Sequence, residues 1–262
     1  MPVTRMASLV PDGIKRRLLT FAKRRLRLAG YSLVAAHARE TGSPDWDVWD
    51  WVAAHAQVRT IIDIGANDGA YGAYLHGFFA AATVHAFEPL ASSRAKLEAL
   101  RDRIPGLTIH AVALSDEAGT ATFFENEFSA ASSLLRISDE ARRAFPETDR
   151  AAAVTVPLAR LDDVLPVDAL ERDILIKIDV QGVEDRVIRG GQAIFSVASV
   201  VLIEMSFVPF YVGQPLFEEV HRLLEACGLR MAGFKNQIND PGTGRPLFAH
   251  CLYVRREDHQ RA

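Results

Sequence analysis

Acidic side chains stand within or just after several short apolar runs of this 262-residue chain. A carboxylate in such a place can accept hydrogen bonds from a ribose diol, attract a cationic group, or take a proton from a reacting hydroxyl. If the apolar runs are parallel strands, these acids gather at the edge of a sheet where such folds bind ligands. The acids concerned are Asp63, Asp68, Glu88, Asp116, Asp179 and Glu204.

The stretch 60–69, with the sequence TIIDIGANDG, is typical of a buried strand that runs into a glycine-rich turn. Gly65 and Gly69 permit positive φ angles or the close approach of a ligand to the backbone. The turn lacks the GxGxxG pattern that a dinucleotide pyrophosphate prefers, and the charges of Asp63 and Asp68 would repel such a group. They favour a cofactor with a cationic amino-acid portion, such as S-adenosylmethionine.

Polar residues after the next two strands extend this candidate cofactor site. Glu88 and Pro89 follow the second strand, and Glu88 lies 23 residues beyond Gly65. This is about where such folds place the acid that binds a ribose diol. Ser115 and Asp116 follow the third strand, where their polar side chains could reach an adenine ring.

Three charged residues near the later strands are candidates for catalysis. Asp179 is the first candidate for a general base, and Glu204 is the second. Lys177 lies on the same strand face as Asp179, where it could orient Asp179, lower the pKa of an acceptor, or form a structural ion pair. We expect no metal site, because no cluster of histidines or cysteines supports one; the alternative is that Asp179 and Glu204 bind a hard metal ion.

Apolar runs and helical patterns alternate along the chain, which predicts an α/β fold with βαβ units and a mostly parallel, doubly wound sheet. The expected strands are 61–64, 83–87, 107–112, 174–178 and 200–205, and the expected helices are 70–80, 90–102, 183–189 and 216–227.

Two segments depart from this alternation. Strand-like stretches at 118–125 and 152–158 predict an inserted hairpin, and the polar segment 126–149 between them predicts a loop able to close over a site. The last two strands, 230–235 and 247–255, predict a closing antiparallel hairpin.

The N-terminal region differs from the rest in charge. Residues 1–40 hold nine Lys or Arg residues against two acidic ones, a net charge of +7, which leaves −10 for the remainder. Residues 14–28 predict an amphipathic basic helix that either packs on the following domain or makes a peripheral contact with an anionic membrane. A Gly-Ser-Pro breaker predicts a boundary between a basic helical extension, 1–45, and a domain, 46–262.

The composition narrows the class of protein. With 49% hydrophobic and 24% charged residues it is typical of a soluble globular protein, and its longest apolar run falls short of the roughly 20 residues of a spanning helix. Cys227 and Cys251 are too few for a disulfide framework, so we expect a reducing, cytoplasmic location. The acidic remainder carries no nucleic-acid recognition motif, so we expect no nucleic-acid partner.

Five motifs in order resemble the FkbM family of methyltransferases. They are IIDIGANDG at 61–69, HAFEP at 85–89, ALSD at 113–116, LDDVL at 161–165 and IKIDVQG at 176–182. The resemblance implies a class I Rossmann-like fold with a seven-stranded sheet and dependence on S-adenosylmethionine. It also implies methylation of a hydroxyl oxygen on a sugar, glycan or secondary metabolite.

The resemblance implies roles for individual residues as well. Gln181 departs from it, because many members carry glutamate at that position. The alternative functions are an NAD-dependent oxidoreductase and a non-catalytic adenosyl-binding module. On the resemblance, Gly65, Asn67 and Gly69 hold the methionine portion of the cofactor, Glu88 the ribose, Ser115 and Asp116 the adenine side, and Asp179 lies where the methyl donor meets its acceptor.

Overall fold

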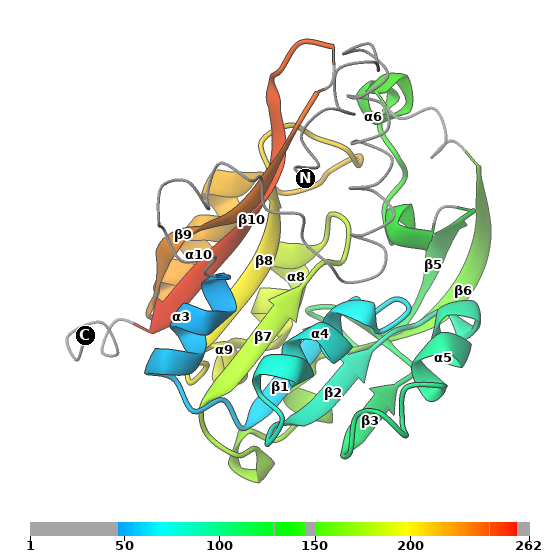
Figure 1. The fold of residues 1–262 in the computed structure, drawn as a ribbon. Helices are drawn as coiled ribbons and strands as arrows, with labels where there is room; N and C mark the ends of the chain where they lie inside the picture. The colour runs from blue at the N-terminus through cyan, green and yellow to red at the C-terminus, as the bar shows by residue number, and fades with distance from the viewer. Residues whose placement is uncertain (1–46, 128, 145–149, 241, 256–262) are drawn as a thin grey trace, which may run out of the picture. The chain divides into compact units, whose positions relative to one another are not determined.

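The computed structural model describes residues 47–127, 129–144, 150–240 and 242–255 (Figure 1). The predicted basic extension, residues 1–45 with the helix expected at 14–28, lies outside the described residues. Its boundary with the following domain therefore stays a prediction.

A seven-stranded sheet forms the centre of the described structure, in the order β3-β2-β1-β7-β8-β10-β9. The first five strands in this order are parallel, whereas β10 runs antiparallel to both β8 and β9. The predicted α/β fold, with its doubly wound, mostly parallel sheet and closing antiparallel hairpin, is confirmed. The strands are β1 (Thr60–Ile64), β2 (Thr83–Phe87), β3 (Leu107–His110), β7 (Ile174–Ile178), β8 (Val200–Ser206), β9 (Leu229–Asn239) and β10 (Pro246–Arg255).

Helices cover both faces of this sheet, because the strand residues are apolar on both sides. Ile61 and Leu175 belong to one core with α3, α4 and α5, whereas Ile62 and Ile176 belong to another with α8, α9 and α10. The helices are α3 (Val48–His55), α4 (Ala70–Phe78), α5 (Ala91–Glu98), α8 (Glu184–Gly190), α9 (Gln192–Phe195) and α10 (Phe217–Ala226).

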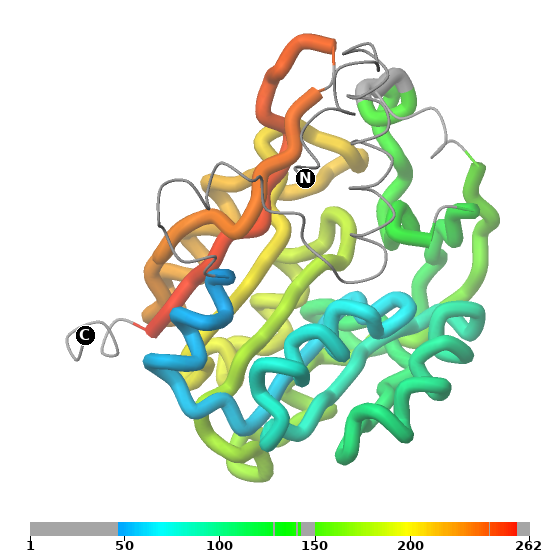
Figure 2. The backbone as a smooth tube through the Cα atoms, viewed as in Figure 1, coloured from blue at the N-terminus to red at the C-terminus, as the bar shows by residue number. Residues whose placement is uncertain are grey.

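The predicted insertion forms a second, smaller sheet. Its order is β4 (Ala113–Leu114), β6 (Ala151–Ala159) and β5 (Gly119–Asn126). β5 and β6 pair antiparallel, which confirms the predicted hairpin, and β4 pairs parallel with β6. The strand predicted at 107–112 is too long, because the chain leaves the large sheet after His110 to pair with the insertion. Figure 2 shows this change of direction and the β9–β10 hairpin extending past the carboxyl end of β8.

Short helices occupy several of the connections. The segment 126–149, predicted to be a loop, contains a 3-10 turn, η1 (Ser129–Ala131), and helix α6 (Asp139–Ala144). The helix α7 (Leu161–Val164) and the 3-10 turn η3 (Val167–Ala169) precede β7. These connections leave the carboxyl ends of β1 and β7, where the winding direction reverses, as the expected place for a ligand.

Candidate active site

A pocket that is partly open to solvent lies at the carboxyl ends of β1, β2 and β7. The inserted segment forms one of its walls. The lining consists of Ile64, Gly65, Asn67, Phe87, Glu88, Pro89, Leu90, Ser93, Val112, Ala113, Leu114, Phe123, Ser129, Ala130, Ser132, Leu134, Asp179, Val180, Gln181 and Val183.

The glycine-rich turn after β1 has the backbone that its sequence predicts. Gly65, Asn67 and Gly69 have φ angles of 73°, 48° and 76°, in the left-handed region that favours glycine and, to a smaller extent, asparagine. A Cβ atom on Gly65 would lie 1.9 Å from the carbonyl oxygen of Asp179. Glycine therefore lets the turn after β1 and the loop after β7 meet at the pocket.

Glu88 is fixed by the backbone that surrounds it. Its Oε2 accepts a hydrogen bond from the Asn67 N–H at 2.9 Å, and its Oε1 accepts one from the Leu90 N–H at 2.8 Å. Burial raises the pKa of Glu88, and these two hydrogen bonds act in the opposite direction. Each carboxylate oxygen keeps a second lone pair, so Glu88 can still accept hydrogen bonds from two hydroxyls in the pocket.

Five residues predicted to bind a cofactor lie outside the pocket lining. Asp68 is exposed and its Oδ1 accepts the Ala70 N–H, and the Ser115 hydroxyl is buried and donates to Asp116. Contact of these side chains with a cofactor stays a prediction, whereas their observed contacts shape the loops around the site. The five are Asp63, Asp68, Gly69, Ser115 and Asp116.

Lys177 is a buried cation between two carboxylates. Its Nζ lies 3.2 Å from Asp63 Oδ1 and 4.0 Å from Asp179 Oδ2, and it donates to the Gly65 carbonyl oxygen at 2.7 Å. Burial lowers the pKa of Lys177, but Asp63 and then Asp179 outweigh it, so the pKa is raised. The structural ion pair is therefore present, and an effect on catalysis would act through Asp179.

The amide of Gln181 joins the two candidate bases. Its Nε2 donates to Asp179 Oδ1 at 2.5 Å and to Glu204 Oε1 at 3.1 Å, and its Oε1 accepts the Tyr211 hydroxyl at 2.8 Å. A glutamine amide can serve two carboxylates in this way because it carries two N–H donors. Asp179 and Gln181 line the pocket, so the network extends from the pocket to Glu204 behind it.

Buried acids beside this network have raised pKa values. Burial raises the pKa of Glu204 well above its ordinary value, and the charges of Asp179 and Glu184 raise it further. Burial also raises the pKa of Glu184 to about 7. Neither carboxyl group lines the pocket itself. Carboxyl groups with raised pKa values beside a pocket are a feature of acid–base sites.

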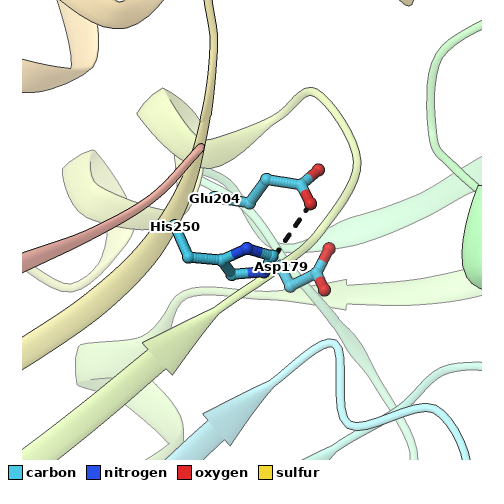
Figure 3. Close-up of side chains that lie close together, drawn as sticks. All are labelled: Asp179, Glu204 and His250. Atoms are coloured by element: carbon cyan, nitrogen blue, oxygen red, sulfur yellow. Dashed lines mark ion pairs between the residues drawn. The ribbon is translucent and has the colours of Figure 1, made fainter. Parts of the chain in front are cut away.

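Sequence reasoning missed His250 on β10. Figure 3 shows His250 beside Glu204 and Asp179, and its Nε2 lies 3.7 Å from Glu204 Oε2. Burial lowers the pKa of His250, so the imidazole is neutral at pH 7. The available signal was a single histidine within the apolar run Leu247–Val254, but its neighbour could not be known without the β8–β10 pairing.

The inserted segment, predicted to act as a lid, forms one side of the pocket. Closure over a bound ligand stays a prediction. Ser129, Ser132 and Leu134 line the pocket, and the Ser133 hydroxyl donates to the Gln181 carbonyl oxygen at 2.6 Å. The lid and the carboxylate network are therefore joined by a direct hydrogen bond.

Comparison with known protein families identifies the family of this chain. The family model described as "Methyltransferase FkbM domain" matches residues 63–231, which is more than half of the chain. The chain belongs to the FkbM methyltransferase family. The cofactor of this methyltransferase is S-adenosylmethionine, as the resemblance implied. The NAD-dependent alternative is therefore set aside.

Two curated relatives match half of the chain. The chain is 33% identical over 156 residues to "Methyltransferase sdnD" of Sordaria araneosa, which is 50% of this chain and 59% of that protein. It is 32% identical over 158 residues to "AMB antimetabolite synthetase AmbE" of Pseudomonas aeruginosa, which is 50% of this chain and 7% of that protein. The match thus spans less than two thirds of either relative.

The crystal structure of an FkbM methyltransferase from Methylobacillus flagellatus is similar in part. It has a TM-score of 0.48 and 13% identity, with 76% of this chain and 44% of that chain covered. Among the described residues of the present chain, the helices are all too short or too polar to cross a membrane.

The pocket residues fit S-adenosylmethionine. Glu88 has free lone pairs for a ribose diol, and Phe87, Val112 and Leu114 offer apolar surface for an adenine ring. Asp179 places negative charge near the pocket, which suits a cationic ligand. When bound, the cofactor supplies an electrophilic methyl group on its sulfonium.

Proposed function

We propose that this protein transfers the methyl group of S-adenosylmethionine to a hydroxyl oxygen of a sugar, a glycan or a secondary metabolite. The observation that carries the proposal is the position of Asp179, which lines the cofactor pocket and also belongs to the carboxylate network with Glu204. A hydroxyl is a poor nucleophile, and a carboxylate within hydrogen-bond reach assists it by accepting its proton.

The chain's own residues would act mainly by position. Gln181 holds Asp179 and Glu204 in fixed orientations, and Lys177 lies on the other side of Asp179. Holding an acceptor in line with a methyl group supplies several kcal/mol of the barrier reduction. Asp179 would accept the proton of the hydroxyl as its oxygen takes the methyl group, so that the products would be a methyl ether and S-adenosylhomocysteine.

The relatives support a secondary metabolite as one acceptor class. One of them is named as an antimetabolite synthetase, which is consistent with a small metabolite as the acceptor. Phe210 follows β8 and is half-buried, so part of its ring is a surface on which a sugar or an aromatic acceptor can stack, whereas Tyr211 is buried. Peripheral membrane contact through residues 14–28, a cytoplasmic location and the lack of a nucleic-acid partner stay predictions of the sequence.

The test uses isotopically labelled methyl donor with panels of sugars, nucleotide sugars and polyhydroxylated metabolites. We expect label in an O-methyl group, identified by the chemical shift of the methyl carbon, together with release of S-adenosylhomocysteine. Label found only on nitrogen or carbon would overturn the proposal, and so would failure of every hydroxyl acceptor beside efficient transfer to an amine or a carbon acid.

The role of Asp179 has its own test. Asp179→Asn removes the proton acceptor while keeping the shape of the side chain, so we expect kcat to fall by about 10²–10⁴-fold. The dissociation constant for S-adenosylmethionine should change much less. Asp168→Asn, on the exposed turn η3, is the matched control and should keep full activity. An unchanged kcat in Asp179→Asn would show that another residue acts as the general base.

A further inference from the structure

Asp179, Glu204 and His250 form one row across three neighbouring strands. Ile178 on β7 pairs with Ile203 on β8, so the next residues along these parallel strands, Asp179 and Glu204, lie side by side. Glu204 in turn pairs directly with His250 on β10. Paired residues in a sheet direct their side chains to the same face, so all three converge on one point.

The three side chains are close enough to bind a single ion. One ligand atom from each lies within 4.8 Å of the others. Ligand atoms about 2.0–2.2 Å from one tetrahedral or octahedral ion lie about 3.0–3.5 Å from one another. The three side chains would therefore have to close around the ion by up to about 1–2 Å from the positions drawn in Figure 3.

Neighbouring contacts leave ligand atoms available. Gln181 donates to Oδ1 of Asp179 and Oε1 of Glu204, which leaves the second oxygen of each carboxylate free of that amide. The Nε2 atom of His250 faces Glu204 Oε2 at 3.7 Å, while the Nδ1 atom is buried without a hydrogen-bond partner among the described residues. Nε2 is therefore the nitrogen placed to bind an ion beside Glu204.

The charge at this place also favours a cation. Glu184 is buried and Glu204 is half-buried near Asp179, while the Nζ of Lys177 lies closer to Asp63, at 3.2 Å, than to Asp179, at 4.0 Å. These acids share one lysine, and a bound cation would favour the charged forms of the carboxyl groups that ligate it.

We propose that Asp179, Glu204 and His250 bind a divalent first-row transition metal ion, such as Mn²⁺, at the edge of the cofactor pocket. One imidazole and two carboxylates match such an ion better than Mg²⁺ or Ca²⁺, which prefer oxygen ligands throughout. Three protein ligands leave positions for water or a substrate oxygen. Its role rests on the proposed function: the ion would polarise the acceptor hydroxyl and lower the pKa of that hydroxyl.

Metal binding is tested apart from methyl transfer. Full-length protein is freed of metal with a chelator and titrated with Mn²⁺ alone, and free Mn²⁺ is followed by its electron paramagnetic resonance signal. We expect one ion per chain. His250→Ala and Glu204→Gln should each weaken binding by at least about tenfold, since even residues that only orient a ligand change metal affinity by about 10–100-fold.

Two controls keep the result interpretable. His55→Ala removes an exposed histidine on α3 and should bind Mn²⁺ as the wild type does. Binding of S-adenosylmethionine by His250→Ala, measured by calorimetry, shows that this variant is folded. Absence of stoichiometric binding at millimolar Mn²⁺, or equal affinity in His250→Ala and the wild type, would overturn the metal site. Neither result would affect the proposed methyl transfer, which is judged by its O-methyl product.

Discussion

Gly65 lies where the turn after β1 meets the loop after β7, and both segments limit the size of a side chain at this position. Gly65→Ala would put a methyl group 1.9 Å from the Asp179 carbonyl oxygen and a β-carbon on a residue with a φ of 73°. The left-handed backbone alone costs about 1–2 kcal/mol, and the clash adds to it. We expect urea unfolding to show a loss of at least about 2 kcal/mol, and calorimetry to show weaker S-adenosylmethionine binding.

Gly77 provides the control for this substitution. It lies in α4, and a Cβ atom there would meet nothing within 4 Å. Gly77→Ala should therefore leave cofactor binding unchanged and stabilise the protein by about 0.4–1 kcal/mol, because alanine is the better helix former. A Gly65→Ala variant as stable as Gly77→Ala would show that the two loops do not need this close approach.

Lys177 offers a second prediction at the residue scale. Lys177→Met removes the cation that lies 3.2 Å from Asp63, a carboxylate that is 1% exposed. Removing one partner of a buried ion pair typically costs about 3–5 kcal/mol, because the other charge stays buried without compensation. The double variant Asp63→Asn/Lys177→Met should recover part of this loss in urea unfolding. An additive double variant would argue against a direct interaction between the two side chains.

The sequence identified those site residues whose surroundings are local. Gly65 was predicted from the turn chemistry of residues 60–69, Asn67 from the family resemblance, and Glu88 from its distance to the turn; all three line the pocket. The place of His250 and the hydrogen bonds of Gln181 could not be predicted from the sequence, since they depend on strand pairing and on a loop contact with Tyr211. Such long-range contacts leave no periodic signal in the sequence.

At the scale of elements, β2 and β3 are joined by a pair of stacked histidines. His85 Nδ1 lies 3.2 Å from His110 Nε2, and His110 also stacks on Phe87. Burial lowers the pKa of His110 to about 4, with a smaller contribution from His85, and burial lowers the pKa of His85. Both rings are therefore neutral in the folded protein at pH 7.

This pair predicts a loss of stability in acid. Unfolded histidine takes up a proton near its ordinary pKa of 6.5, whereas folded His110 does so only near 4. Between these values the unfolded state binds more protons, so the contribution of His110 is full above about pH 6.5 and is lost as the pH falls toward 4. His110→Gln should flatten the dependence of the unfolding free energy on pH in this window. His55→Gln, an exposed control, should keep the wild-type slope.

The elements themselves were predicted well where they alternate and less well where they do not. Short apolar runs predicted β1, β2 and β7 within one residue of their observed ends. The strand predicted at 107–112 runs two residues past β3, and the short strand β4 was not predicted, because only its pairing with β6 defines it. Tertiary pairing overrode a local pattern that was correct in itself.

At the scale of the whole molecule, the cofactor pocket joins parts that are separate in sequence. Its walls come from the turn after β1, the end of β2, the insertion and the loop after β7. A ligand that contacts all four is bound only by the folded chain, so it stabilises the fold by mass action. S-adenosylmethionine should therefore raise the melting temperature of the whole domain, and by an amount that its concentration determines.

The expected size of this shift follows from linkage. At a concentration of about 100 times the dissociation constant, the stabilisation is about 2.7 kcal/mol. A domain of this size gains about 2–4 °C for each kcal/mol, so differential scanning fluorimetry should show a rise of about 5–11 °C.

Glu88→Gln should reduce the rise strongly, since the amide cannot accept the hydrogen bonds that Asn67 and Leu90 now donate to both oxygens. Glu218→Gln, on the exposed side of α10, should show the full rise. NAD should not raise the melting temperature comparably. An equal rise with NAD, or an undiminished rise in Glu88→Gln, would contradict binding of the methyl donor in this pocket.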